Sequence, residues 1–455
     1  MKDMDPTRIV EDNSVCNYDH VETDINTWHF YANGYEVVKK VISDFTEANV
    51  IGSSANYTVG NVMEDVPLMN SECGNVWGID GSAGDSDMSW HYHYMINQFR
   101  LEEKLCGFVF TEFHDVVNEF NGYYRIDNTE KMFGFEEYVP GMSMVDLHTQ
   151  DFLAYDAVPM RTVKGGETVK IPLYISSFTD KYHDKDMKIR AELWYTDDSG
   201  TCHFFDVKEI GIKYNRYGLI DTGEAELRMP QEEAVAVARL YLETADGETV
   251  MRNFTTFDVR DEIEGIEIPL DSADVEGHGK FCQEGAKLNL FNGASAKFDI
   301  PLEGLDLSNG VEILFEASAR ETFTRDRIGD DENELKVGSY MLGYRVDPGE
   351  NPNCFFMTDE KLYPSTMTVK INEKSMKVLL PDSPADSRGC LSWHYQAQDR
   401  RLDDAGTYGY MVSIVLDGED IKSNKLSLEI SSDRGISLFG RNSGRYPTGL
   451  RVAGR

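Results

Sequence analysis

The amino-acid sequence predicts a multidomain protein in which an α/β segment precedes all-β domains. Three observations lead to this prediction. Apolar runs alternate with helix-like stretches over roughly the first 145 residues. From about residue 146 onward, a period-two alternation of apolar and polar residues replaces the helical period. The chain of 455 residues is also long enough for two to four domains, each with its own core.

The α/β segment contains four predicted strands and two predicted helices. In the first of these helices, Tyr35–Val50, the residues Val38, Val41 and Ile42 share one face. Strands that alternate with helices lie parallel and are joined by right-handed crossovers. The second predicted helix is Met88–Leu105, and the predicted strands are Thr7–Ser14, Asp24–Tyr31, Val66–Cys73 and Cys106–Phe113.

All four predicted strands finish in polar side chains. In a β/α barrel, polar residues at the carboxyl ends of strands are typical of an active site, because the loops that bind substrate begin there. We therefore expect these side chains to gather at one edge of the sheet. They are Asp12 and Asn13 on the first strand, His29 and Tyr31 on the second, Glu72 on the third, and Glu112, His114 and Asp115 on the fourth.

The remaining two-thirds of the chain has the pattern of β-sandwiches. Alternating runs separated by the turn at Gly165-Gly166, and hairpins around "DDSG" and "ADGE", predict an immunoglobulin-like sandwich over residues 146–262. Further alternating runs predict a second sandwich over residues 263–432. Residues 433–455 are basic and rich in glycine, which predicts a flexible tail.

The charge of the chain limits its partners. With 80 acidic and 44 basic residues, the net charge is −36. A polyphosphate would be repelled, which argues against nucleic acid, and so would an anionic membrane surface. A neutral, hydroxyl-rich ligand such as a sugar is compatible with this charge. The acidic residues also have a simpler interpretation, in which they only keep the surface soluble.

The cysteines and the apolar runs indicate a cytoplasmic protein. Seven cysteines lie far apart, their number is odd, and no CxxC pair occurs, so we expect free thiols in a reducing compartment and no zinc site. No run approaches the roughly 18 apolar residues of a membrane span. The N-terminus lacks the pattern of a signal peptide.

The strand motifs, taken in order, resemble glycoside hydrolase family 2, the family of β-galactosidases, β-glucuronidases and β-mannosidases. The resemblance covers about 120 residues and implies that residues 1–145 are the C-terminal half of a TIM (β/α)8 barrel. "PDSPADSRGCLSWHYQ", followed by "AGTYGYMV", resembles galactose-binding-like sandwich domains and implies that fold for residues 263–432. Four motifs match barrel strands five to eight: "DPTRIVEDNS", "DINTWHFY", "PLMNSECGNVWG" and "CGFVFTEFHDVVNEFNGYYR".

This resemblance implies retaining hydrolysis of terminal β-linked, galactoside-like sugars, with Glu72 as the nucleophile. Tyr31 would orient Glu72 by a hydrogen bond. His29, Asn13 and Glu112 would face the sugar hydroxyls, and either Trp77 or Trp90 would stack on a sugar face. The resemblance implies no cofactor. His91 and His93 lie in a helical stretch, where residues two apart diverge, so no metal site is expected there.

The acid/base glutamate of the family is missing from its expected position. It follows an asparagine at the end of the fourth strand, but no Asn-Glu pair precedes Thr7, and the pairs Asn118-Glu119 and Asn372-Glu373 lie in the wrong places. Loss of a general acid typically costs a factor of about 10² to 10⁴ in rate. The resemblance therefore implies a C-terminal fragment that is inactive alone, unless a complementing N-terminal chain or a second copy completes it. The alternative is a non-catalytic carbohydrate-binding or structural protein with a vestigial half-barrel.

Overall fold

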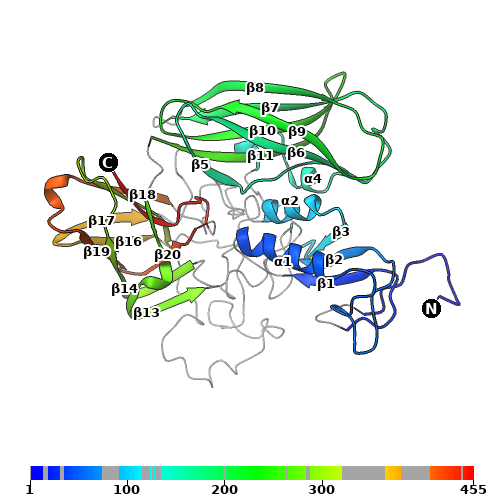
Figure 1. Cartoon of the computed structure of the whole chain (residues 1–455), viewed down its shortest axis with the longest axis horizontal. Helices are drawn as coiled ribbons and strands as arrows, with labels where there is room; N and C mark the ends of the chain where they lie inside the picture. Colours follow the sequence, from blue (N-terminus) through cyan, green and yellow to red (C-terminus); the bar gives the residue numbers. More distant parts are fainter. Residues whose placement is uncertain are drawn as a thin grey trace.

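The computed structural model describes residues 2–13, 19–30, 35–73, 92–114, 123–124, 128, 135–197, 201–261, 265–282, 287–319, 364–380, 410–441 and 444–455. β-Sheet dominates these ranges, and Figure 1 shows three groups of elements. The first group comprises strands β1–β3 with helices α1 and α2. The second comprises β4–β11, and the third comprises β12–β21.

The N-terminal group is a parallel sheet with the strand order β1-β2-β3. Its helices and strands are β1 (Asn26–Phe30), α1 (Tyr35–Ala48), β2 (Leu68–Cys73), α2 (His93–Leu101) and β3 (Leu105–Phe110). Three of the four predicted strands and both predicted helices are thereby confirmed.

No helix in the described part of the chain is long and apolar enough to span a membrane.

Both helices pack on the same face of this sheet through aromatic side chains of β1. Trp28 stacks on Phe45 of α1 with ring centroids 4.3 Å apart, and it meets Phe99 of α2 edge-on at 6.2 Å. Phe30 also contacts Phe99, at 5.9 Å. Burying each of these rings contributes about 1.5–3 kcal/mol. Because side chains alternate along a strand, Thr27 and His29 lie on the opposite face.

The predicted strand Thr7–Ser14 is wrong, because its described residues, 7–13, form no strand. This segment instead runs beside β1 and is held mainly by side chains. The Asp24 backbone N–H donates to the Val10 carbonyl at 2.9 Å, and the Val10 N–H donates to the Asp24 carboxylate at 2.8 Å. Such local side-chain bonds compete with a backbone ladder. The described residues thus form three parallel strands rather than four.

His20 occupies the outer backbone edge of β1. Its Nε2 accepts a hydrogen bond from the Thr27 N–H at 3.0 Å, and its Nδ1 lies 2.6 Å from the Asp12 carboxylate. Asp12 also accepts hydrogen bonds from the N–H groups of Val21 and Glu22. A polar loop therefore satisfies an edge where a neighbouring strand would otherwise pair.

The second group is a β-sandwich, as predicted. One sheet has the order β5-β11-β10-β7-β8 and the other β4-β6-β9, and inward side chains of both share one core. The predicted hairpins correspond to β7–β8 and β10–β11. The elements are α3 (Phe135–Tyr138), α4 (Met144–Leu147), β4 (Asp151–Tyr155), β5 (Met160–Lys164), β6 (Thr168–Ser177), β7 (Met187–Thr196), β8 (Cys202–Ile212), β9 (Gly218–Arg228), β10 (Ala234–Thr244) and β11 (Thr249–Arg260).

The third group is a single hydrogen-bonded sheet around its own core. Its main path is β12-β21-β15-β20-β14-β19-β16-β17, with β13 paired to β14 and β18 to β15. The described strands are β12 (Ile266–Ile268), β13 (Asp274–Cys282), β14 (Lys287–Pro301), β15 (Val311–Ala319), β16 (Ser365–Ile371), β17 (Lys374–Leu380), β18 (Tyr410–Leu416), β19 (Lys425–Ser432), β20 (Gly435–Phe439) and β21 (Leu450–Gly454). Two short 3₁₀ turns, η3 (Leu270–Ser272) and η8 (Gly418–Asp420), connect strands.

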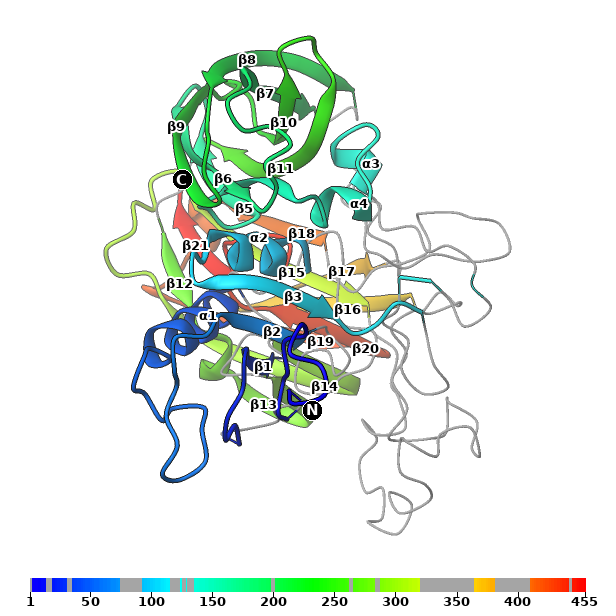
Figure 2. The ribbon, with the colours of Figure 1, turned by 90° about the vertical axis from the view of Figure 1, so that its right-hand side faces the viewer.

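The prediction that residues 433–455 form a flexible tail is also wrong. This segment supplies β20, which pairs with β14 and β15, and β21, which pairs with β12 and β15. Ile436, Leu438, Leu450 and Val452 are buried in the core. Their alternate apolar positions fill the core, and two glycines of the segment, Gly435 and Gly454, lie within the strands themselves. Figure 2 shows both strands within the body of the protein.

The role of the C-terminal strands can be tested with two leucines of the same sheet. Leu438 is 1% exposed, whereas Leu379 on β17 is 67% exposed. We expect Leu438→Ala to lower the free energy of unfolding by about 2–5 kcal/mol, since it leaves a cavity. Leu379→Ala should change it by less than about 0.5 kcal/mol. Denaturant unfolding measures both, and equal effects would contradict a packed C-terminal segment.

The polar edge of β1 predicts an acid-sensitive contribution to stability. Burial acts to raise the pKa of Asp12, but hydrogen bonds from Val21, His20 and Glu22 outweigh it and hold the pKa below its usual value. Such a carboxyl stabilises the fold above its unfolded pKa, and this stabilisation is lost as the pH falls through the folded pKa. We expect Asp12→Asn to cost about 1–3 kcal/mol at pH 7 and progressively less below about pH 4. Urea unfolding across pH measures this.

The control for this experiment is Asp65→Asn, which removes an equal charge from an exposed loop. Its effect on the free energy of unfolding should stay below about 0.5 kcal/mol at each pH. A loss at Asp65 equal to that at Asp12 would show that general charge, rather than the loop contacts, sets the pH dependence.

Candidate functional site

An extra residue in β2 determines which way Glu72 points. Residues 26–28 of β1 pair in order with residues 68–70 of β2, but the next residue, His29, pairs with Glu72. Ser71 is therefore the extra residue of a β-bulge, a device that re-aims the side chains that follow it. Residues paired across parallel strands point to the same face. Glu72 thus joins His29 on the face away from the helices.

The bulge sends the following residue, Cys73, into the core. Cys73 pairs with Phe30, is fully buried, and has its Sγ 3.4 Å from the Val109 carbonyl. Burial raises the pKa of the Cys73 thiol, with the nearby Glu72 charge as a second cause. The thiol is consequently neutral at physiological pH, so it is a packing residue rather than a nucleophile.

Glu72 and His29 form the central pair of the site. The Glu72 Oε2 lies 3.6 Å from the His29 Nδ1, and the two side chains are 33% and 13% exposed. This separation is that of an ion pair rather than a short hydrogen bond. The Glu72 carboxylate thus keeps access to solvent and to a ligand while a potential cation lies beside it.

Glu112 reaches the same edge from the third strand. The Thr111 N–H donates to the Cys73 carbonyl at 2.7 Å, which holds the residues after β3 against the end of β2. Glu112 follows through a cis peptide bond, and its Oε1 is buried. Three successive strands therefore bring His29, Glu72 and Glu112 to the carboxyl edge of the sheet.

An aromatic network behind this edge was not predicted from the sequence. The hydroxyls of Tyr92 and Tyr123 lie 2.5 Å apart, and the Tyr123 hydroxyl lies 2.8 Å from the His148 Nε2. The Tyr123 ring stacks on Phe110 at 4.5 Å, and its backbone N–H donates to the Glu112 carbonyl. Burial raises the pKa of both tyrosines, so both hydroxyls stay protonated and donate. The paired tyrosines in "NGYYR" were the available signal.

Asn13 and His93 make their described contacts outside this group. Asn13 donates from its Nδ2 to the Asp19 carboxylate at 2.6 Å, within the loop beside β1. Tyr31, Trp77, Trp90 and His91 lie outside the described residues. His93 is buried in α2, with its Nε2 2.5 Å from the Asn253 Oδ1. Within the described ranges, no three His, Cys, Asp or Glu side chains gather closely enough to hold a metal ion.

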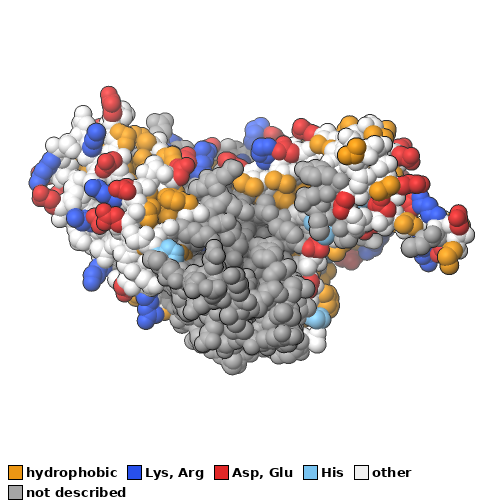
Figure 3. All heavy atoms as spheres, turned by 90° about the horizontal axis from the view of Figure 1, so that it is seen from below, with side chains coloured by type: hydrophobic (Ala, Val, Ile, Leu, Met, Phe, Trp, Pro, Cys, Tyr) orange, Lys and Arg blue, Asp and Glu red, His pale blue; other side chains and the backbone are white. Residues whose placement is uncertain are grey.

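Charges of both signs are mixed over the molecular surface. Figure 3 shows acidic and basic side chains interspersed on the described parts of one face. On the described parts of that face, the excess of acid is therefore spread out rather than gathered in one patch.

Comparisons with known proteins found structural neighbours but no sequence relatives. No protein-family model and no curated protein matches the chain. The neighbours include a Bacteroides uniformis β-glucuronidase, 12% identical over 95% of this chain and 46% of that one, with a TM-score of 0.25. A Parabacteroides merdae β-glucuronidase is 13% identical over 83% and 44%, with a TM-score of 0.26. The Amycolatopsis orientalis exo-chitosanase CsxA is 6% identical over 80% and 33%, with a TM-score of 0.27.

These neighbours have glycoside hydrolase folds, and the chain spans less than half of their length. The TM-scores and identities are too low to assign a family or a function. What the chain does has to be judged from its own site.

Substitutions can test whether the bulge places Glu72 and Cys73 on opposite faces of the sheet. We expect Cys73→Asp to lower the free energy of unfolding by more than about 3 kcal/mol, because it buries a carboxylate against Phe30. Glu72→Gln should change it by less than about 1 kcal/mol, since Glu72 is partly exposed. The nearly isosteric Cys73→Ser is the control, with an intermediate loss of about 1–3 kcal/mol. A larger loss at Glu72 than at Cys73 would contradict this assignment of faces.

Proposed function

We propose that the chain supplies the nucleophilic half of a retaining β-glycosidase of the glycoside hydrolase family 2 type. In this proposal, β1–β3 belong to the C-terminal half of a (β/α)8 barrel, and the face opposite α1 and α2 is the barrel interior. The observation that carries the proposal is the register of β1 on β2. With the bulge at Ser71, it places Glu72 beside His29 on that face, at the carboxyl edge where Glu112 also lies.

Glu72 would act as the nucleophile. One carboxylate oxygen attacks the anomeric carbon, and a bond to that carbon forms as the bond to the leaving oxygen breaks. The leaving oxygen takes the bonding electron pair and a proton from a general acid, and water later releases the sugar. His29, 3.6 Å away, would help to orient the carboxylate.

Further residues complete the proposed site. Tyr31, two residues after His29, would donate a hydrogen bond to Glu72. Glu112 would accept a hydrogen bond from a sugar hydroxyl, and Trp77 would stack on the sugar ring. Asn13 would contact the sugar only after releasing Asp19. The substrate would be a terminal β-linked sugar of the galactoside type.

The general acid would come from a separate N-terminal segment, supplied by another chain or a second copy. Among the described residues, β3 has β2 as its only strand neighbour, and α1 and α2 pack on one face of the sheet. A further set of βα units would pair with β3 and cover the opposite face, as parallel sheets require. A complete enzyme would thus form only on assembly.

The proposal can be tested in the absence of the general acid. The test uses a substrate whose leaving group departs without receiving a proton. We expect a 2-deoxy-2-fluoro-β-galactosyl fluoride to transfer its glycosyl group to Glu72, with fluoride leaving as the anion. Intact-protein mass spectrometry should show one added glycosyl group, and peptide mapping should place it on Glu72. Glu72→Gln should remain unlabelled. Glu64→Gln, an exposed residue of the loop before β2, should be labelled like the wild type.

The result that overturns the proposal is also specific. The β-galactosyl, β-glucosyl, β-mannosyl and β-glucuronyl fluorides would all leave the wild type unmodified. If calorimetry then detects sugar binding that Glu72→Gln retains, the chain is a non-catalytic carbohydrate-binding protein.

A further inference from the structure

A cavity of about 240 Å³ lies where helices α1 and α2 meet the first sandwich. Its lining comes from α1, the end of α2, the residue after β4, and strands β6 and β9. Figure 1 shows both helices next to the strands of that sandwich. The volume is below the range of drug-sized sites, which limits a ligand to about one small ring.

Gln98 of α2 is the residue that distinguishes this cavity. It is 5% exposed, and its side chain makes no hydrogen bond within the described part of the chain. Unlike the Arg100 Nε, which is sealed off without a partner, the amide atoms of Gln98 keep accessible surface. Because Gln98 lines the cavity and is otherwise covered, this open surface of the amide lies on the cavity.

The neighbouring amide on α2 shows how such a side chain is satisfied when its role is structural. Asn97 donates to the Tyr155 carbonyl at 2.6 Å and accepts from the Tyr155 N–H at 3.2 Å. Polar groups at this depth are normally bonded to protein or to water. Gln98 therefore has donors and an acceptor that an occupant of the cavity has to satisfy.

Three other polar side chains of the lining can also form bonds. The Tyr174 hydroxyl and the Glu102 carboxylate make no hydrogen bond or ion pair with other described residues. The Ser43 Oγ donates to the Glu47 carboxylate at 3.0 Å and keeps its lone pairs for accepting. Donors and acceptors are thus available from α1, from the end of α2 and from β6.

The charges of the lining do not favour an ionic ligand. The Lys39 ammonium lies 3.1 Å from the Asp156 carboxylate, so these two charges neutralise each other. The remaining charge of the lining is the carboxylate of Glu102, which repels an anion. A single partly exposed carboxylate also holds a cation only weakly, because water screens it. A neutral ligand fits this balance best.

Ile42, Leu101 and Leu219 make up the apolar part of the lining. Binding sites typically combine such an apolar wall with a small number of convergent polar groups. A sugar ring matches this combination, because it presents C–H groups on a face and hydroxyls around its rim.

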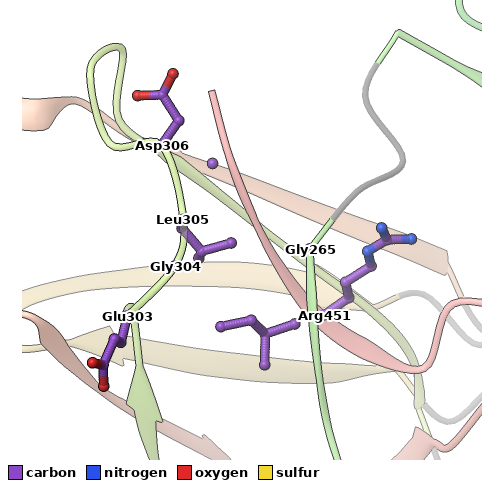
Figure 4. A pocket seen from close by; sticks show the side chains of 8 residues that line it. Gly265, Glu303, Gly304, Leu305, Asp306 and Arg451 are labelled. Carbon is purple, nitrogen blue, oxygen red and sulfur yellow. The ribbon is translucent and has the colours of Figure 1, made fainter.

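A larger cavity in the C-terminal sheet, of about 500 Å³, lacks this convergence. Figure 4 shows its charged side chains, Glu303, Asp306 and Arg451, pointing away from one another. The Asp306 carboxylate accepts the Ser308 N–H at 2.9 Å, two residues along the chain. Volume alone therefore does not single out a site, whereas the open amide of Gln98 does.

We propose that the cavity between α1, α2 and the first sandwich binds one neutral sugar ring, with Gln98 as its main hydrogen-bonding residue. The amide donates to one ring hydroxyl and accepts from another, while the apolar wall covers a C–H face. The bound ring contacts the helices and the sandwich at once, so it joins these two groups. The site lies on the helix side of the N-terminal sheet, and its occupation does not depend on the proposed role of Glu72.

The test uses the full chain and four probes: glucose, galactose, methyl β-galactoside and sodium glucuronate. Saturation-transfer NMR, which detects weak binding, should show binding of glucose or galactose and weaker binding of glucuronate. Equal binding of galactose and its methyl glycoside identifies the end of a longer glycan as an acceptable source. Binding of a free sugar without the glycoside identifies a monosaccharide.

Matched variants locate the site. Gln98→Met keeps the length of the side chain and should weaken sugar binding about tenfold, as expected for two lost hydrogen bonds. Its urea midpoint of unfolding should be unchanged or higher, because it breaks no bond within the described protein. Gln150→Met makes the same change at an exposed residue outside the cavity and should bind like the wild type. Ser43→Phe fills the cavity from α1 and should abolish binding, which keeps the test decisive if Gln98→Met does not fold.

Four outcomes overturn the proposal. Glucose, galactose and the glycoside all fail to bind the wild type, or glucuronate binds more tightly than glucose. Gln98→Met and Ser43→Phe bind as tightly as Gln150→Met. Glu72→Gln loses binding that Gln98→Met retains, which assigns the sugar to the strand-end site instead. Sugar binding that depends on Gln98 in a chain whose Glu72 stays unlabelled would refute only the proposed glycosidase.

Discussion

The register of β1 on β2 is the constraint on which the candidate site depends. Trp28 and Phe30 have to face α1 and α2, because their rings form the core between sheet and helices. Strict alternation along β2 would then turn Glu72 toward the helices. The extra residue, Ser71, shifts the alternation once, which frees Glu72 and buries Cys73 instead. Apolar packing and the placement of a carboxylate are thus reconciled by one inserted residue.

Helix α2 connects the N-terminal sheet to the rest of the molecule. Its side chains from His93 to Phe99 are all buried, because the sheet covers one side and the first sandwich covers the other. Asn97 donates to the Tyr155 carbonyl at 2.6 Å, and His93 lies against Asn253. From α1, the Tyr35 hydroxyl donates to the Gly444 carbonyl at 2.8 Å, which ties the helices to the C-terminal sheet. The first sandwich and the C-terminal sheet therefore support the site although they supply none of its strand-end carboxylates.

The apolar periodicity of the sequence correctly predicted the strands that are held by apolar packing. It gave wrong predictions for segments whose structure depends on polar side chains or that are rich in glycine. The runs around Trp28, Leu68 and Phe108 are strands whose apolar side chains pack in one core with the helices. Thr7–Ser14 has a similar run, but the Asp24 carboxylate accepts the Val10 N–H, and His20 accepts the Thr27 N–H of the neighbouring β1. The glycines of residues 433–455 led to the prediction of a flexible tail, although Leu438 and Val452 of this segment are core residues. The resemblance located Glu72, but a bulge such as that at Ser71 has no signature in a single sequence.

The position of β21 has a consequence for the order of events during synthesis. This strand, residues 450–454, lies between β12 and β15 rather than at the edge of its sheet. Since β21 is the only described strand that pairs with β12, residues 266–268 must wait without a strand partner until the ribosome has added almost 190 further residues. Closing so long a loop is entropically slow, and the exposed intermediate is prone to aggregate. The C-terminal sheet consequently completes its fold only after translation has passed Gly454.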